Sequence, residues 1–498
     1  MNDTPADDLL RALVRRGLTE AEVLIKRGRS RRLEIGLGHE VATFSQERAW
    51  AVRASSRRAS LFAAGSGDAP GADLARGRGG GRVAARPGGA APGAPEAPAA
   101  GGIAADWPEA SGRPFRLPEP AAAPPWNEPS DLAAPLLGES EGLRLLESLG
   151  RELAAELPGA RLLHAALEDG SSESELVNSR GLRVRFRRRL ATLHLEAAGP
   201  GRPGGAASLY LAEREARRFH PAILARRLAD RLAVTATGSP AVRGEAEGSG
   251  GDNGGRGGPG GAGAAGLGAG ALASGGTMLL APAVAAALLA ALLPLLVGPE
   301  AAARQAPLRD RRGRIGSAHL TIVDNGRLPG GALECPVDGE GVPTGEAMLV
   351  EAGIYRQPLL AWWQADGAAA GAATGCSRRP GWRDLPRPGP THLYLRPEPR
   401  VAVAALLAEI RQGHYLLEPT GPARYDAVAD RFLLPVCGLA IAGGRATAPV
   451  AAACLCGSAS ALFKGLAGVG RDLSFLPLDG MIGSPSLLVN GLELTAGR

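Results

Sequence analysis

The sequence predicts an α+β protein, because a few segments place apolar residues at helical spacing while many more alternate apolar and polar residues at strand spacing. Helical spacing is clear from Leu9 to Val14 and from Leu146 to Leu157. Short strand-like runs separated by glycine and proline fill most of the last part of the chain. We therefore expect small N-terminal α/β modules with antiparallel strands, followed by a larger strand-rich C-terminal domain.

Composition divides the 498-residue chain into folded segments and insertions. Hydrophobic residues make up 45% and charged residues 21%, which are ordinary values for globular domains. Residues 67–130 consist mainly of Gly, Ala, Pro and Arg, and residues 238–276 contain 17 glycines. Both compositions are typical of disordered insertions. They leave three folded segments, at residues 7–66, 131–237 and 277–498.

Each folded segment has its own predicted elements. The first is expected to form a helix and then a small antiparallel meander, and the second a helix, two strands and a further helix. The third is expected to begin with an apolar helix and to continue as short strands with one more helix. In the first segment the meander is predicted from Val23 and Ile25, Leu33 to Leu37, and Trp50 and Val52. In the second, the strands are predicted at residues 161–167 and 182–195, and the further helix has Phe219, Ile223 and Leu232 on its inner side. In the third, the helices are predicted at residues 278–297 and 400–411, and Gly413 is expected to end the last one.

Residues 278–297 contain no polar side chain over about the thickness of a membrane. Two alternatives follow, a transmembrane helix and a buried core helix. Pro282, Pro294, the high alanine content and the lack of flanking Trp, Tyr or basic residues favour the core helix.

The net charge of +6 does not indicate a nucleic-acid partner. Only Lys26 and Lys464 are lysines, and no run interleaves arginine with aromatic residues that could stack on bases. The acidic N-terminus does not resemble a secretory signal, and five irregularly spaced cysteines do not form a disulfide framework. A cytoplasmic location is therefore expected.

Three short motifs have simpler explanations than catalysis or ligand binding. Residues 138–142 match the G-x-S-x-G pattern, but no buried strand precedes Ser140, which better suits a helix N-cap. Residues 261–266 match a dinucleotide pattern inside a glycine tract, without the strand that such a site needs. The alternation of Arg183, Arg185 and Arg187 favours the solvated face of a strand over an anion site.

No metal site is expected from the chain spacing, because the seven histidines never occur within one helical turn of each other. Cys454 and Cys456 stand in C-x-C spacing without a second pair, so small thiols are the default interpretation.

The most specific run of residues lies in the third segment. It joins Asp324, at the end of a strand, to a glycine-rich turn from Asp338 through Glu340 to Thr344. Carboxylates in such turns can accept backbone N–H bonds and shape a loop, or they can face a cleft and bind a peptide amine or a partner's arginine.

These residues and others along the chain resemble the TldD/PmbA family, also called the modulator of DNA gyrase family, whose members are linked to proteolysis. The resemblance covers all three segments in order. It rests on Ala21-Glu22-Val23, Val177 to Leu182, Thr321 to Asp324, Asp338 to Thr344, Thr374-Gly375 with Arg378 or Arg379, Gly413-His414-Tyr415, and Gly483 to Leu487.

The resemblance implies the metal-free, PmbA-like branch of the family. The TldD-like branch carries a zinc-binding H-E-x-x-x-H helix at the start of its last domain and a cysteine ligand further on. Here the corresponding residues Leu279 to Ala285 and Arg471 to Ser474 offer neither motif. Cys376 and His392 also depart from the family, which often has Asn there.

The function expected from this resemblance is that of a subunit, without metal or cofactor of its own, which pairs with a zinc-bearing TldD-like chain to form a peptide-processing protease. A homodimer is a further expected assembly. The loop of this chain that contacts the substrate or the partner would comprise Asp324, Asp338, Glu340, Thr344 and Arg378. Without a metal-activated water or an evident nucleophile–base pair, no catalytic residue is assigned.

Two other functions remain open on the sequence. One is a self-sufficient peptidase with Cys335 or Cys376 as nucleophile, and the other is a homodimeric peptide-binding scaffold.

Overall fold

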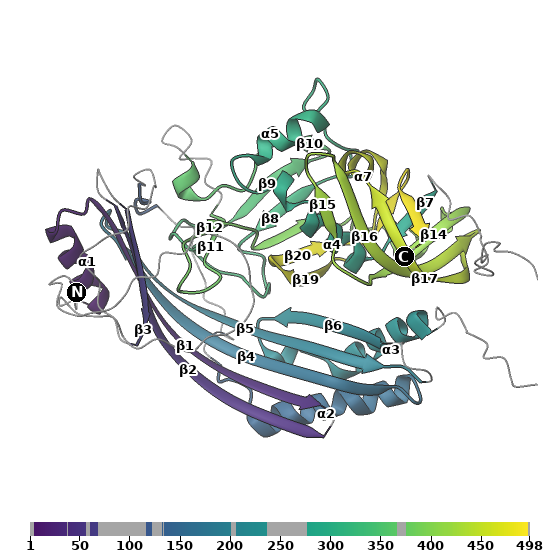
Figure 1. Ribbon diagram of the computed structural model, residues 1–498, viewed down its shortest axis with the longest axis horizontal. Helices are drawn as coiled ribbons and strands as arrows, with labels where there is room; N and C mark the ends of the chain where they lie inside the picture. The colour runs from purple at the N-terminus through teal and green to yellow at the C-terminus, as the bar shows by residue number, and fades with distance from the viewer. Residues whose placement is uncertain are drawn as a thin grey trace, which may run out of the picture.

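The computed structural model describes residues 4–36, 38–55, 60–67, 116–121, 132, 134–200, 206–236, 276–365 and 375–496. A long, curved sheet from the N-terminal half lies under a C-terminal domain built from two further sheets (Figure 1). The mixture of helices with mainly antiparallel sheets confirms the α+β class. The two predicted insertions, residues 67–130 and 238–276, lie largely outside the described residues.

The N-terminal half forms one six-stranded antiparallel sheet in the order β3-β2-β1-β4-β5-β6. Its strands therefore come from both of the first two segments that the sequence analysis separated. Its elements are α1 (Pro5–Arg15), β1 (Glu20–Gly36), β2 (His39–Ser55), β3 (Ser60–Ser66), α2 (Glu139–Glu156), β4 (Arg161–Asn178), β5 (Arg183–Ala198), β6 (Ala206–Glu213) and α3 (Pro221–Ala236).

The prediction of a small meander of short strands is wrong, because the observed strands are much longer. Strand β1 runs unbroken through Lys26 to Arg32, which contain no apolar side chain and show no alternation. These residues stay extended because β2 and β4 pair with them on both sides. Backbone hydrogen bonding to two neighbours thus replaces the missing hydrophobic pattern.

The two faces of this sheet have different chemistry. Leu33, Leu167 and Leu193 point to one face, where they form a buried core with the leucines of α2 and α3. Alternation along the strands sends Glu168 and Thr192 to the opposite face. That face turns toward the C-terminal domain (Figure 1).

The N-terminal helices form where the leucine spacing predicts them, but two details of the prediction are wrong. Helix α2 begins at Glu139 with Gly138 as its N-cap, so Ser140 lies exposed in the first turn and is not the cap. In α3, Ile223 is 59% exposed, whereas Leu224, Leu228 and Leu232 are buried. Of the predicted inner stripe, Phe219 and Leu232 are therefore buried as expected, and Leu224 takes the place of Ile223.

The C-terminal domain contains two larger sheets and one short pair, β11-β12. One sheet has the order β10-β9-β8-β13-β20-β19, and the other β18-β21-β7-β14-β16-β17-β22 with β15 paired to β16. Its elements are β7 (Thr277–Leu280), α4 (Pro282–Ala291), α5 (Ala301–Gln305), β8 (Ile322–Asn325), β9 (Glu346–Glu351), β10 (Ile354–Tyr355), β11 (Ser377–Arg378), β12 (Arg387–Pro388), β13 (His392–Leu395), α6 (Val403–Ala408), β14 (Gln412–Pro419), β15 (Arg424–Asp426), β16 (Arg431–Ala442), β17 (Arg445–Gly457), α7 (Ala459–Gly465), β18 (Leu466–Val469), β19 (Ser474–Leu478), β20 (Gly480–Ser484), β21 (Leu487–Val489) and β22 (Glu493–Ala496).

Helix α4 is the centre of this domain's core. It contacts β19 and β20 of one sheet and β7, β14 and β16 of the other, and Val284, Leu288 and Leu289 are buried there. The predicted 20-residue helix is wrong, because its first residues form strand β7 and α4 ends at Ala291. Among the described residues, no helix combines the length and the apolar character needed to span a membrane.

The last predicted helix is also shorter than expected. Helix α6 covers only Val403–Ala408, and Gly413 belongs to strand β14. An added Cβ at Gly413 would lie 1.9 Å from the carbonyl oxygen of Thr277. This glycine therefore permits the close approach of β14 to β7 and does not end a helix.

Candidate functional site

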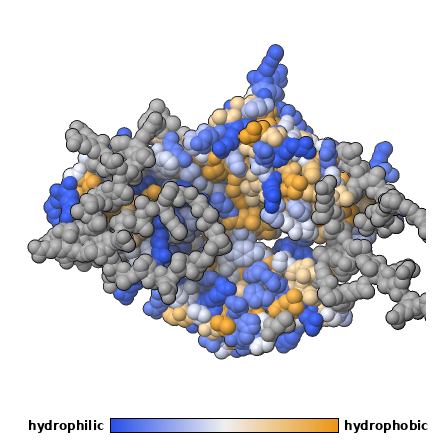
Figure 2. Space-filling view, in the orientation of Figure 1, coloured by the Kyte–Doolittle hydropathy of each residue, from blue (hydrophilic) through white to orange (hydrophobic). Residues whose placement is uncertain are grey.

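A cavity of about 710 Å³ separates the polar face of the N-terminal sheet from the C-terminal domain. Figure 2 shows the hollow between the C-terminal domain and the sheet below it. The sheet contributes Glu168 and Thr192, and the C-terminal domain contributes Asp338, Arg378 and Trp382. A cavity of this size with charged groups on both walls can hold a short polypeptide segment.

The Asp338 turn is shaped by its own carboxylate. One oxygen of Asp338 accepts the backbone N–H groups of Glu340 (2.8 Å) and Val342 (2.9 Å), and the other accepts that of Ser377 (2.9 Å). Burial, and then the neighbouring charge of Glu340, raise the pKa of Asp338 to about 7. Asp338 lines the cavity, but its oxygens are already used to hold two loops together.

Glu340 lies at the centre of a buried charge network between the two domains. Its carboxylate pairs with Arg53 of β2 (3.0 Å) and accepts hydrogen bonds from the Ser377 hydroxyl (2.6 Å) and the Trp362 amide (2.8 Å). Arg53 also pairs with Glu22 of β1 (3.1 Å), and Glu22 binds Arg379 in turn. We call Glu22, Arg53, Glu340 and Arg379 the interdomain network. Its alternating charges fix the C-terminal domain on the sheet.

The other predicted site residues are also engaged internally. Asp324, in β8, accepts the Thr391 N–H at 2.8 Å, and burial raises its pKa to about 7. The Thr344 hydroxyl donates to the carbonyl of Cys335. Arg378 donates to the carbonyl of Pro390 (2.5 Å), and burial lowers its pKa. Of these three side chains, Arg378 lines the cavity.

Cys335 has an arginine partner, and the ring of His392 is not available to it as a base. The Arg188 guanidinium donates to its sulfur at 3.1 and 3.2 Å, while the thiol donates to the carbonyl of Val337 at 3.0 Å. His392, in β13, uses Nε2 to accept the Leu333 N–H (3.1 Å), so Nδ1 carries the proton that it donates to Asn325 (2.9 Å). With both nitrogens occupied, this imidazole cannot take a proton from the thiol.

The arginine alternation on β5 lies on an exposed part of the sheet. Arg183 binds Asp7 of α1, and Arg185 binds Glu173 of β4. The side chains of Arg183 and Arg185 are 44% and 67% exposed. These cross-element ion pairs fit the solvated face that the sequence predicts.

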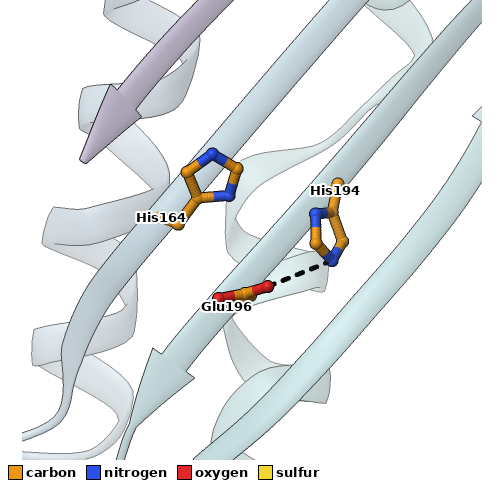
Figure 3. Close-up of side chains that lie close together, drawn as sticks. All are labelled: His164, His194 and Glu196. Carbon is orange, nitrogen blue, oxygen red and sulfur yellow. Dashed lines mark ion pairs between the residues drawn. The ribbon is translucent and has the colours of Figure 1, made fainter. Parts of the chain in front are cut away.

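One group of metal-ligand side chains was missed by the sequence analysis. His164 of β4 and His194 and Glu196 of β5 each place one donor atom within 4.8 Å of the others (Figure 3). The two histidines are 30 positions apart, so a search within one helical turn could not pair them. The strand register brings them together, since His164 lies opposite Glu196 and Ala166 opposite His194.

Helix α4 does not fit the zinc site of the TldD-like branch. It contains only Pro, Ala, Val and Leu, and the following turn Leu293–Leu295 adds only Leu and Pro. None of these side chains has a nitrogen, oxygen or sulfur that could bind zinc.

The architecture defines a two-domain α+β protein with a metallopeptidase-type C-terminal domain, since residues 275–496 match the family model of the PmbA/TldA metallopeptidase C-terminal domain. The C-terminal domain therefore belongs to the PmbA/TldA metallopeptidase C-terminal domain family. A search of curated proteins found no match.

Solved structures share the fold over the whole chain. TldE from Thermococcus kodakarensis is 16% identical with a TM-score of 0.77, covering 99% of this chain and 100% of that one. A proposed modulator of DNA gyrase from Thermotoga maritima is 16% identical with a TM-score of 0.71, covering 98% and 99%. Another from Bacteroides thetaiotaomicron is 15% identical with a TM-score of 0.67, covering 99% and 98%.

Proposed function

We propose that this chain is a cytoplasmic, PmbA-like subunit that pairs with a zinc-bearing TldD-like chain to form a peptide-processing protease. In this assembly the partner supplies the metal-activated water, and this chain supplies part of the chamber that holds the peptide. The observation that carries the proposal is the donor-free helix α4 at the start of a metallopeptidase-type domain.

The cavity supports a role in holding peptides. Its floor is the half-exposed polar face of β1, β4 and β5, and its roof is formed by the loops near Asp338 and Trp382. The interdomain network fixes floor and roof relative to each other, and its Arg379 also lines the cavity. Such preformed walls reduce the conformational entropy that binding a flexible peptide would otherwise cost.

The predicted substrate or partner loop takes a supporting part in this proposal. Asp338 and Glu340 brace the roof through their bonds to Ser377 and Arg53, and Arg378 presents its side chain to the cavity. The cysteine-peptidase alternative is less well supported, because Cys335 and Cys376 are both buried and His392 cannot act as base for Cys335.

The test compares the purified chain, a candidate TldD-like chain, and both together on a fluorogenic library of unfolded peptides. We expect no cleavage by this chain alone, cleavage by the mixture, and loss of that cleavage on adding a zinc chelator. The control mixture contains a TldD-like chain whose motif glutamate is replaced by glutamine, and it should be inactive. Cleavage by the isolated chain, with or without chelator, would overturn the proposal.

Size measurement separates the proposed pairing from the scaffold alternative. Analytical ultracentrifugation of the mixture should show a species containing both chains. If this chain forms only a homodimer and ignores the TldD-like chain, the heteromeric proposal is wrong.

A further inference from the structure

Three side chains on the open face of the N-terminal sheet form a cluster that the proposed function does not use. His194 and Glu196 are two positions apart on β5, so both point to the same face, and His164 joins them from β4. The His164 and His194 ring centroids are 5.7 Å apart, and His194 Nε2 lies 3.6 Å from Glu196 Oε1. We call these three residues the sheet cluster.

The donor atoms of the sheet cluster are close to zinc-binding geometry. They all lie within 4.8 Å of one another. Zinc bonds of about 2.0–2.2 Å to nitrogen and oxygen require neighbouring ligand atoms at about 3.4 Å in a tetrahedron. Side-chain rotations that move the atoms by about 1 Å would suffice, and the half-exposed positions leave room for them. Two imidazoles and a carboxylate are a donor set that zinc prefers.

A second observation points to the same ligand. Nε2 of His164 lies 3.0 Å from Glu34 Oε1 of β1. This contact leaves Nδ1 of His164 for a metal, and Figure 3 shows a ring nitrogen of His164 directed toward His194. A carboxylate that holds the second nitrogen of a ligating histidine is the usual outer partner in zinc sites. Arg32 in turn binds Glu34 at 3.1 Å and so holds the Glu34 carboxylate in place beside His164.

The cluster is also accessible to an ion and to water. The side chains of His164, His194 and Glu196 are 25%, 37% and 49% exposed. His194 lines a hollow of about 460 Å³ with Glu168, Thr192 and Tyr210, residues that also line the larger cavity. A fourth zinc position would therefore open toward the chamber between the domains.

We propose that His164, His194 and Glu196 bind one zinc ion, with Glu34 as the positioning residue for His164. This site lies in the N-terminal sheet, far in sequence from helix α4. The inference does not depend on the proposed pairing with a TldD-like chain. Bound zinc would link β4 to β5 and stabilise the folded chain according to its affinity.

The test uses the full chain freed of metal by a chelator and then titrated with Zn²⁺ against a chromophoric competitor. We expect one zinc per chain, a rise in melting temperature with zinc, and visible bands of tetrahedral Co²⁺ after cobalt substitution. His164→Ala and His194→Ala should each weaken binding at least 100-fold, and Glu34→Gln about 10- to 100-fold.

The matched control is His220→Ala, which removes an exposed histidine of the same domain away from the cluster. It should bind zinc like the unchanged chain. Because the cluster is half-exposed, the His194→Ala chain should melt without zinc at the same temperature as the unchanged chain. Zinc binding that His164→Ala and His194→Ala leave intact, or no stoichiometric binding at micromolar zinc, would overturn the inference.

This outcome is separate from that of the proposed function. Failure to bind zinc would leave the pairing proposal standing, whereas cleavage by the isolated chain would defeat the pairing proposal without touching the metal site.

Discussion

The Asp324 and Asp338–Glu340 loops of the C-terminal domain and the open face of the N-terminal sheet hold their ionisable side chains in different environments. In the C-terminal domain, Asp324, Asp338 and Glu340 are at most 4% exposed, and each accepts hydrogen bonds from loops or from an arginine. On the open face of the N-terminal sheet, His194 and Glu196 keep more than a third of their surface in water. The buried carboxylates therefore hold the architecture together, while the exposed face is free to bind ligands.

The largest effect should come from breaking the interdomain network. Arg53→Ala leaves Glu22 and Glu340 buried without their shared cation, so the free energy of unfolding should fall by about 3–5 kcal/mol. Urea unfolding followed by circular dichroism measures this. The control is Arg396→Ala, which removes an exposed ion pair with Glu346 and should cost less than about 1 kcal/mol. Equal costs for the two variants would contradict the structural role of the network.

A second prediction concerns Asp324, whose pKa burial raises from 3.8 to about 7. The folded chain binds this proton more tightly than the unfolded chain. The stability that it contributes is therefore fully present below pH 3.8 and is lost as the pH rises through 7. Since a tenfold change in proton affinity is worth about 1.4 kcal/mol, the loss approaches about 4 kcal/mol. Asp324→Asn should remove this loss of stability between low and high pH. Urea unfolding at pH 4 and pH 8 would measure the difference. An unchanged pH dependence would show that water reaches this carboxyl.

His392 should titrate in the opposite sense. Burial lowers its pKa from 6.5 to about 4, and the Leu333 N–H, which donates to Nε2, also requires the neutral ring. Its contribution to stability is present above pH 6.5 and is lost as the pH falls through 4, by up to about 3 kcal/mol. His392→Asn should lose less stability than the unchanged chain between pH 7 and pH 4, as measured by thermal unfolding. A variant that loses as much would mean that the folded chain accepts the protonated ring.

The smallest effect on stability is expected on the open face. Tyr210, on β6, is 48% exposed and meets His194 edge to face with ring centroids 6.1 Å apart. Tyr210→Ala should change the free energy of unfolding by no more than about 0.5 kcal/mol. It should nevertheless weaken binding of a labelled unfolded peptide about tenfold, as fluorescence anisotropy would detect, because aromatic side chains often dominate binding surfaces. Trp363→Ala, an exposed aromatic outside the cavity lining, is the matched control. Similar binding by both variants would argue that the peptide does not occupy this face.

Several elements can be predicted from the sequence alone, because only residues close together along the chain specify them. The leucine spacing of α1 and α2, the proline that starts α4 and the turn centred on Asp338 all follow from neighbours along the chain. These features depend on helical periodicity, backbone restriction and short side-chain hydrogen bonds, which a few consecutive residues are enough to specify. The absence of metal-binding side chains from α4 is likewise evident from its amino-acid sequence.

Contacts between residues far apart in the sequence become visible only in the folded chain. Strand β1 continues through its polar Lys26–Arg32 stretch because two neighbouring strands hydrogen-bond to it. The residues of β7 were predicted to be helical, and they form a strand because β14 and β21 pair with them. The ion pairs of Glu340 with Arg53 and the approach of His164 to His194 depend on domain packing and strand register. Neither leaves a periodic signal in the sequence, because the partners are set by contacts across space and not by spacing along the chain.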